Sequence, residues 1–221
     1  MCGILVAYCH KNGIEFKNLF ERKLKLTKHR GPDCSGIYII DKTVLLKNDK
    51  TKTIYSSVGH NRLAVMGVES ISEPLEKQPF VVYNSDILGQ EENECVLTVN
   101  GEIFNYEKIK EDTPEYNYKT RSDCEVILPL LKKYGTSAPM YLDGEYSFVA
   151  VSENRIVVAR DPIGIVPLYM GTDKYNVLWF SSELKSILEM CPSATQFPPG
   201  HVFTQEEGLV PYINKDWFVY N

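Results

Sequence analysis

The feature that most constrains the fold is an apolar run close to the N-terminus. Residues 3–9 read GILVAYC, without a single charged side chain. A strand with one buried face alternates apolar and polar residues, whereas a strand buried on both faces is apolar almost throughout. We therefore expect a strand over residues 3–9 that other parts of the chain cover on both sides.

Two kinds of pattern predict the remaining elements. Apolar residues recur at helical spacing from residue 16 to 24, which predicts an amphipathic helix to about residue 29 and a turn at 30–33. Further helices are expected over 105–111, over 181–190, and from a capping box at Ser122 and Glu125 to Gly135, with a kink at Pro129. Strands are expected at 36–40, 43–47, 55–66, 95–99, 177–181, in a hairpin over 145–160, and in a last pair around the turn at 206–208.

Strands outnumber helices in this pattern, and they do not alternate with them as in a doubly wound sheet. The sequence therefore predicts an α+β fold. The strand at 95–99 is expected to end at Asn100-Gly101. The acid-rich stretch 67–94 is expected to be a surface loop with a short strand or two.

Composition excludes several functional classes. A length of 221 residues suits one domain or two small ones, and the net charge of -5 gives no basic footprint for nucleic acid. No window approaches the ~20 consecutive apolar residues of a membrane span, and the first residues do not resemble an export signal. The six cysteines and four histidines lack metal-ligand spacing, so we expect no metal, reduced thiols and a cytoplasmic location.

Cys2 differs chemically from the other five cysteines, which are expected to be small buried or half-buried residues. Removal of Met1 would leave Cys2 with both a thiol nucleophile and a free α-amine, whose ordinary pKa is ~8. Such an amine can act as general base for the thiol and then return the proton to a leaving amine. Taken alone, a cysteine at position 2 carries little weight.

Ten short motifs give Cys2 its context, because they occur in the order found in one protein family. The chain resembles the class II glutamine amidotransferases of the N-terminal-nucleophile (Ntn) hydrolase superfamily, most closely the glutaminase domain of glutamine-hydrolysing asparagine synthetases. The motifs are MCGI at 1–4, HRGPD at 29–33, SG at 35–36, HNRLAV at 60–65, NGEIFNY at 100–106, SDCEVI at 122–127, LDGEYSF at 142–148, RDPIGIVPLY at 160–169, SSELK at 181–185 and PPGH at 198–201.

The resemblance implies a fold and a domain. It implies a four-layer αββα sandwich of the Ntn-hydrolase type, with two antiparallel sheets between helical layers. It also implies that residues 2–221 form one class II glutamine amidotransferase (glutaminase) domain that hydrolyses L-glutamine to L-glutamate and ammonia. The ammonia would then serve asparagine synthesis from aspartate.

The resemblance also implies roles for individual residues. Cys2 matches the nucleophile that forms a γ-glutamyl thioester, and Asn100 with Gly101 matches the oxyanion hole, whose donors can each be worth ~3–4 kcal/mol. Arg62 and Asp123 match the groups that hold the glutamine α-carboxylate and α-ammonium. Glu102, Leu63 and Val65 match the remaining glutamine-lining positions.

Ordinary structural roles remain open for the same residues when the resemblance is set aside. Asn100-Gly101 suits a hairpin turn, Arg62 a solvated strand position and Asp123 the first turn of a helix. His29 and His60 are expected to be structural partners, because the α-amine serves as the base in this family.

The match to asparagine synthetases stops short of their second domain. The sequence has no Ser-Gly-Gly-x-Asp-Ser pyrophosphate loop or other nucleotide cradle. We expect no cofactor for the glutaminase reaction, ATP and Mg only in a synthetase domain or partner absent from this chain, and an ammonia-accepting synthetase as that partner. The chain would be either an excised domain or a separate ammonia-supplying protein, and a homodimer is open.

Three other functions remain as alternatives. The same half-reaction could feed another acceptor, such as an amino-sugar or nucleotide precursor. An N-terminal cysteine acylase could act on another amide, although Arg62 with Asp123 argues against it. The chain could also be a non-catalytic glutamine-binding module that has the same fold.

Overall fold

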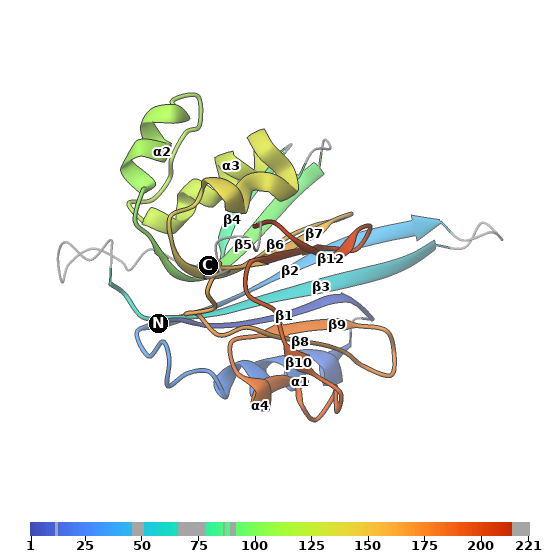
Figure 1. Ribbon diagram of the computed structural model, residues 1–221. Coiled ribbons are helices and arrows are strands. Elements are labelled where there is room, and N and C mark those ends of the chain that lie inside the picture. The colour runs from blue at the N-terminus through green and yellow to red at the C-terminus, as the bar shows by residue number, and fades with distance from the viewer. Residues whose placement is uncertain (12, 46–50, 66–77, 86, 89–91, 214–221) are drawn as a thin grey trace.

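Two six-stranded antiparallel sheets form the centre of the computed structural model, which describes residues 1–221 except 12, 46–50, 66–77, 86, 89–91 and 214–221 (Figure 1). In spatial order, the first sheet consists of β10 (Thr195–Gln196), β8 (Tyr169–Thr172), β9 (Leu178–Ser181), β1 (Gly3–His10), β3 (Thr51–Arg62) and β2 (Cys34–Leu45).

The second sheet has the same number of strands and is also antiparallel at every pairing. Its order is β12 (Gly208–Pro211), β11 (His201–Thr204), β7 (Ile156–Arg160), β6 (Gly144–Ser152), β5 (Glu92–Ile103) and β4 (Phe80–Ser85).

Helices cover the outer face of each sheet, so the molecule has four layers (Figure 1). The expected αββα sandwich is therefore confirmed. The first sheet is covered by α1 (Ile14–Lys25) and α4 (Leu184–Ile187). The second is covered by α2 (Tyr106–Asp112), α3 (Ile127–Tyr134) and the 3-10 helices η1 (Asp123–Val126) and η2 (Gly135–Tyr141).

Strand β1 is buried on both faces, as its apolar run predicts. Ile4, Val6 and Tyr8 belong to the core between the two sheets. Leu5 and Ala7 point the other way, into the core beneath α1. Because side chains alternate along a strand, an apolar residue is needed at every one of these positions.

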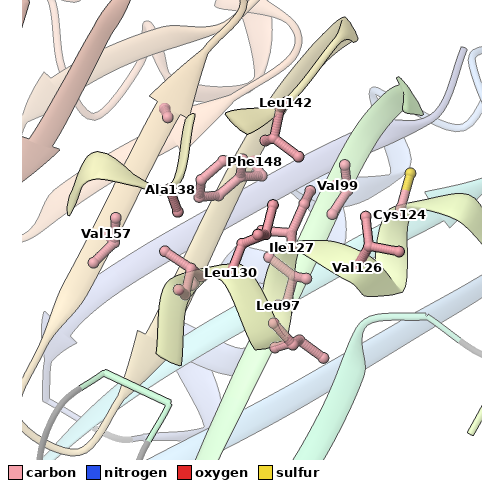
Figure 2. Packing of buried hydrophobic residues seen from close by; sticks show 14 of the residues in the cluster. Leu97, Val99, Cys124, Val126, Ile127, Leu130, Ala138, Leu142, Phe148 and Val157 are labelled. Atoms are coloured by element: carbon pink, nitrogen blue, oxygen red, sulfur yellow. The ribbon is translucent and has the colours of Figure 1, made fainter. Parts of the chain in front are cut away.

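The outer face of the second sheet carries the largest core of the fold. Figure 2 shows Ile127 and Leu130 of α3 packed among side chains from the strands below, including Leu97 of β5 and Phe148 of β6. This packing holds the segment 122–131 against β5, which positions Asp123 at the end of that strand.

The structure corrects the expectation that a strand ends at Asn100-Gly101. β5 continues to Ile103, and Gly101 pairs with Tyr146 of β6. Gly101 has a φ of 152°, and a Cβ at this position would lie 2.1 Å from the backbone oxygen of Glu145. Glycine is therefore required for a tight passage within the strand and does not mark a turn.

The segment around Pro129 also differs from its prediction. Instead of one kinked helix, η1 is followed by α3, and Pro129 lies in the first turn of α3, where a missing N–H is tolerated. The capping box is only half formed. Ser122 Oγ accepts the N–H of Cys124, but Glu125 instead accepts the N–H groups of residues 119 and 120.

Several element boundaries differ because pairing continues where local pattern suggests a break. The strands expected at 36–40 and 43–47 form one strand, β2, which pairs with β3 along its whole length to Leu45, while residues 46–47 lie outside the described part. The helix expected at 181–190 shrinks to α4, and β8 and β10 were not predicted. Of the stretch 67–94, residues 67–77, 86 and 89–91 lie outside the described part, while β4 and the start of β5 give it strand structure.

His60 of β3 links the two sheets across the central core. Its Nδ1 lies 2.9 Å from Thr98 Oγ1 of β5, and the side chain is fully buried. Burial, helped by the nearby charge of Arg62, lowers the pKa of His60 to about 3, so this imidazole is neutral at physiological pH.

A pH-dependent loss of stability should follow from His60. In the unfolded chain this histidine binds a proton near pH 6.5, but in the folded protein it does so only near pH 3. As the pH falls below ~6.5, proton binding therefore favours the unfolded chain and the free energy of unfolding decreases. Between pH 7.5 and pH 5 we expect the native protein to lose about 2 kcal/mol more than His60→Gln, measured by urea unfolding. His201→Gln should keep the native dependence, and equal losses in native protein and His60→Gln would contradict this interpretation.

Candidate active site

One cavity collects most of the residues assigned from the sequence. It lies where β1 begins and β3 ends in the first sheet, beside the end of β5 in the second. Of the eight predicted site residues, only Asn100 does not line this cavity. The other seven do: Cys2, Arg62, Leu63, Val65, Gly101, Glu102 and Asp123.

Cys2 is held at the start of β1 by contacts with distant parts of the chain. The Leu63 N–H donates to Cys2 Sγ at 3.4 Å. Arg30 Nε donates to the backbone oxygen of Cys2 at 3.0 Å, and Arg30 Nη1 is itself held by Glu183 Oε1 at 2.9 Å. The nucleophile candidate is thus fixed through both its side chain and its backbone.

The surroundings of Cys2 favour the protonated thiol. Burial raises the pKa of the Cys2 thiol above its ordinary value, and the Leu63 N–H, the positive chain terminus and Arg62 only partly offset this effect. A thiol of raised pKa needs a nearby base before it can attack. Neither His29 nor His60 lines the cavity, since His29 contacts Glu183 and His60 contacts Thr98.

Met1 occupies part of the wall of the same cavity, whose volume is about 50 Å³. While Met1 is present, the nitrogen of Cys2 is a peptide nitrogen and cannot act as a base. Removal of Met1 would supply a free amine beside Sγ and would also enlarge the cavity.

Asn100 contributes a buried carboxamide without a partner. Its side chain is 0% exposed, and neither Nδ2 nor Oδ1 has a hydrogen-bond partner among the described residues. Asn100 alternates with Val99 along β5, so its side chain points between the sheets, on the same face as Thr98. An unpaired buried amide is costly unless a ligand or water satisfies it, so the Asn100 side chain is a candidate donor to a bound group.

Arg62 and Asp123 give the cavity one positive and one negative group. Arg62 is the last residue of β3 and is buried. Asp123 Oδ2 accepts the N–H of Ile103 at 2.7 Å, which fixes its orientation at the end of β5. Groups of both signs suit a ligand that carries both charges, as a free amino acid does.

Sequence reasoning missed several residues that the structure brings to this site. Gln78, Ser122, Cys124 and Glu145 also line the cavity. Ser122, Cys124 and Glu145 lie within the motifs at 122–127 and 142–148, although no role in the site was assigned to them, whereas Gln78 lies in none of the ten motifs. Arg30 was predicted only as part of a turn, and no local pattern could reveal its contacts with residues 2 and 183.

The described residues include no cluster of three or more His, Cys, Asp or Glu side chains placed to hold a metal ion. Within that same part of the chain, no helix is both long and apolar enough to cross a membrane.

Comparison with known proteins decides the family. The Glutamine amidotransferase domain family matches residues 1–202. The chain belongs to the class II glutamine amidotransferases. The resemblance inferred from its motifs is therefore confirmed.

Curated relatives at moderate identity include asparagine synthetases. "Asparagine synthetase [glutamine-hydrolyzing] 1" of Saccharomyces cerevisiae is 36% identical over 98% of this chain and 34% of its own length. "Probable asparagine synthetase [glutamine-hydrolyzing]" of Dictyostelium discoideum is 38% identical over 99% of this chain and 36% of its own length. The chain thus spans about a third of the length of these relatives.

Solved structures support the fold. The "structure of the allosteric regulatory enzyme of purine biosynthesis" matches with a TM-score of 0.71 at 21% identity, covering 96% of this chain and 49% of that one. The "glutamine phosphoribosylpyrophosphate (PRPP) amidotransferase from B. subtilis" matches with a TM-score of 0.65 at 22% identity, covering 95% and 48%.

The anchor of Cys2 gives a prediction about stability. Arg30→Ala removes a largely buried cation from Glu183 and from the Cys2 carbonyl, so the free energy of unfolding should fall by about 2 kcal/mol. Glu183→Gln should cost less, and the double variant should differ from the sum of the single changes by about 1 kcal/mol.

Lys185→Gln is the matched control, because this exposed lysine lies 3.8 Å from the same carboxylate. It should change stability by less than about 0.5 kcal/mol. Strict additivity of the Arg30 and Glu183 changes would show that their contact is not energetically coupled.

Proposed function

We propose that this chain hydrolyses L-glutamine to L-glutamate and ammonia through a thioester on Cys2. The observation that carries the proposal is that one cavity joins Cys2 to Arg62, Asp123 and Gly101. Gly101 directly follows Asn100, whose buried carboxamide has no partner among the described residues. Membership of the glutamine amidotransferases supports the same reaction.

Substrate recognition would use opposite charges at one end of the ligand. The Arg62 guanidinium would bind the glutamine α-carboxylate, and the Asp123 carboxylate would bind the α-ammonium. Glu102 and the Leu63–Val65 segment would line the rest of the amino-acid site. This arrangement would select a free amino acid, because a residue within a peptide lacks both end charges.

The chemical step would use the amine that appears when Met1 is removed. The Cys2 α-amine takes the thiol proton as Sγ attacks the side-chain carbonyl carbon of glutamine. Asn100 Nδ2 and the Gly101 N–H stabilise the oxyanion, and the protonated amine gives its proton to the departing ammonia. Water then attacks the thioester, which releases glutamate and restores the thiol.

The destination of the ammonia is the second part of the proposal. Relatives named as glutamine-hydrolysing asparagine synthetases are about three times as long as this chain, which supports transfer to a synthetase domain or subunit that activates aspartate. ATP and Mg²⁺ would serve that half, while the glutaminase half would need no cofactor. We place the reaction in the cytoplasm, in an assembly that can include a homodimer.

A direct assay tests the proposed reaction. The purified chain is mixed with glutamine, glutamate and ammonia are quantified, and intact mass reports whether Met1 has been removed. We expect processed protein to release glutamate and ammonia in equal amounts, and Cys2→Ala to be inactive. Retention of Met1 in active protein, or full activity of Cys2→Ala, would contradict the mechanism.

The oxyanion role of Asn100 predicts a kinetic signature. Asn100→Ala should lower kcat by about 10²–10³ while KM changes little, because the donor acts mainly on the charge that develops in the transition state. Asn18→Ala, at an exposed position of α1, is the control and should match the parent protein. A large rise in KM with kcat unchanged would instead assign Asn100 to ground-state binding.

A further inference from the structure

We infer that a second cavity of this protein binds a small molecule with a flat apolar body and a carboxylate or phosphate group. The cavity lies in the helical layer of the first sheet, at the opposite end of β1 from Cys2. Cys9 and His10 line it, and seven strand residues place Cys9 about 23 Å from Cys2. The two cavities share no lining residue.

The floor of this second cavity is aromatic and aliphatic. Its volume is about 610 Å³, within the range of small-molecule sites. Side chains from α1, β3, the region around β9 and the turn after α4 form the apolar surface: Phe16, Leu19, Ile54, Val177, Trp179 and Met190.

Polar contacts hold the aromatic floor in place. His10 stacks on Phe16 with ring centroids 3.7 Å apart, and His10 Nε2 lies 2.8 Å from Ser57 Oγ. Trp179 Nε1 donates to Asp173 Oδ2 at 3.1 Å. The rings are therefore fixed before any ligand arrives, which lowers the entropic cost of binding.

Three lysines give the cavity rim an excess of positive charge. Lys11, Lys52 and Lys174 line it, are exposed, and form no ion pair with any residue that the structure describes. The Lys174 ammonium lies 5.0 Å from the Tyr175 ring, at the cavity rim. The protein as a whole has a net charge of -5, so this positive cluster stands out from its surroundings.

The two acids that line the cavity are already engaged. Glu189 pairs with Lys23 and Arg22. Asp173 accepts the Trp179 indole N–H and two backbone N–H groups. Since neither carboxylate pairs with a rim lysine, the lysines are available to an external anion.

These observations select the chemical class of the ligand. Aromatic side chains favour a flat apolar body. A lysine ammonium is a compact positive charge that can donate hydrogen bonds to either a carboxylate or a phosphate. A small polar amino acid such as glutamine would leave the apolar floor uncovered. The inference is therefore independent of the glutaminase reaction proposed above.

Calorimetric titration with three naphthalene probes tests the inference on the purified chain. 2-Naphthoate and 2-naphthyl phosphate carry the anion, and 2-naphthamide is a neutral control of similar shape. We expect saturable binding of both anions and at least about fivefold weaker binding of the amide, as expected for contacts to two or three partly exposed cations. A phosphate at least fivefold tighter than the carboxylate assigns the natural ligand to phosphate esters, a carboxylate at least fivefold tighter assigns it to carboxylates, and similar affinities support a site for either anion.

The variant Lys52→Gln/Lys174→Gln localises the binding. Both side chains are exposed, so the fold should be kept, which thermal unfolding checks. This variant should weaken the anionic probes about tenfold and leave 2-naphthamide unchanged, whereas Lys119→Gln, on the opposite helical layer, should bind all three as the parent does. Equal affinity for anion and amide, an unaffected double variant, or no saturable binding up to about 10 mM probe would each overturn the inference.

Discussion

Burial of β1 on both faces is the constraint on which the rest of the structure depends. Ile4, Val6 and Tyr8 hold the two sheets together, while Leu5 and Ala7 hold the layer of α1. Displacement of this strand would expose apolar surface on both of its sides, which costs about 25 cal/mol for each Å². Cys2 immediately precedes this strand, so the proposed nucleophile is attached to a strand that is buried on both faces.

The site is assembled from strand ends that belong to different sheets. Cys2 and Arg62 come from neighbouring strands of the first sheet, whereas Gly101 and Asp123 come from the second sheet and the helix beyond it. Packing between the sheets therefore sets the distance from the proposed nucleophile to the proposed oxyanion donors. This is why the central core matters for chemistry as well as for stability.

The sequence could predict the elements that a local pattern of apolar residues marks and the residues that lie in motifs shared with a family. The apolar run of β1 was sufficient to predict its burial, and the motifs predicted the four-layer fold and seven residues that line one cavity. The strand through Gly101 was missed, because Asn-Gly is also a common turn and only the backbone of Glu145 shows why glycine is needed.

Contacts between distant residues could not be predicted from local pattern. Arg30 bonds the backbone of Cys2 and the side chain of Glu183, which lies 153 positions away along the chain. The second cavity likewise combines side chains from three separate segments, residues 9–19, 52–54 and 172–192. Such arrangements depend on the sheet order, which the spacing of apolar residues does not specify.

Met1 connects the physical chemistry of the cavity to the proposed reaction. With Met1 in place, burial keeps the Cys2 thiol protonated, no histidine lines the cavity, and the wall includes the methionine itself. Loss of this one residue would provide the missing base and the missing space at the same position. In the proposed reaction, the adjacent amine would remove the thiol proton during attack on the substrate.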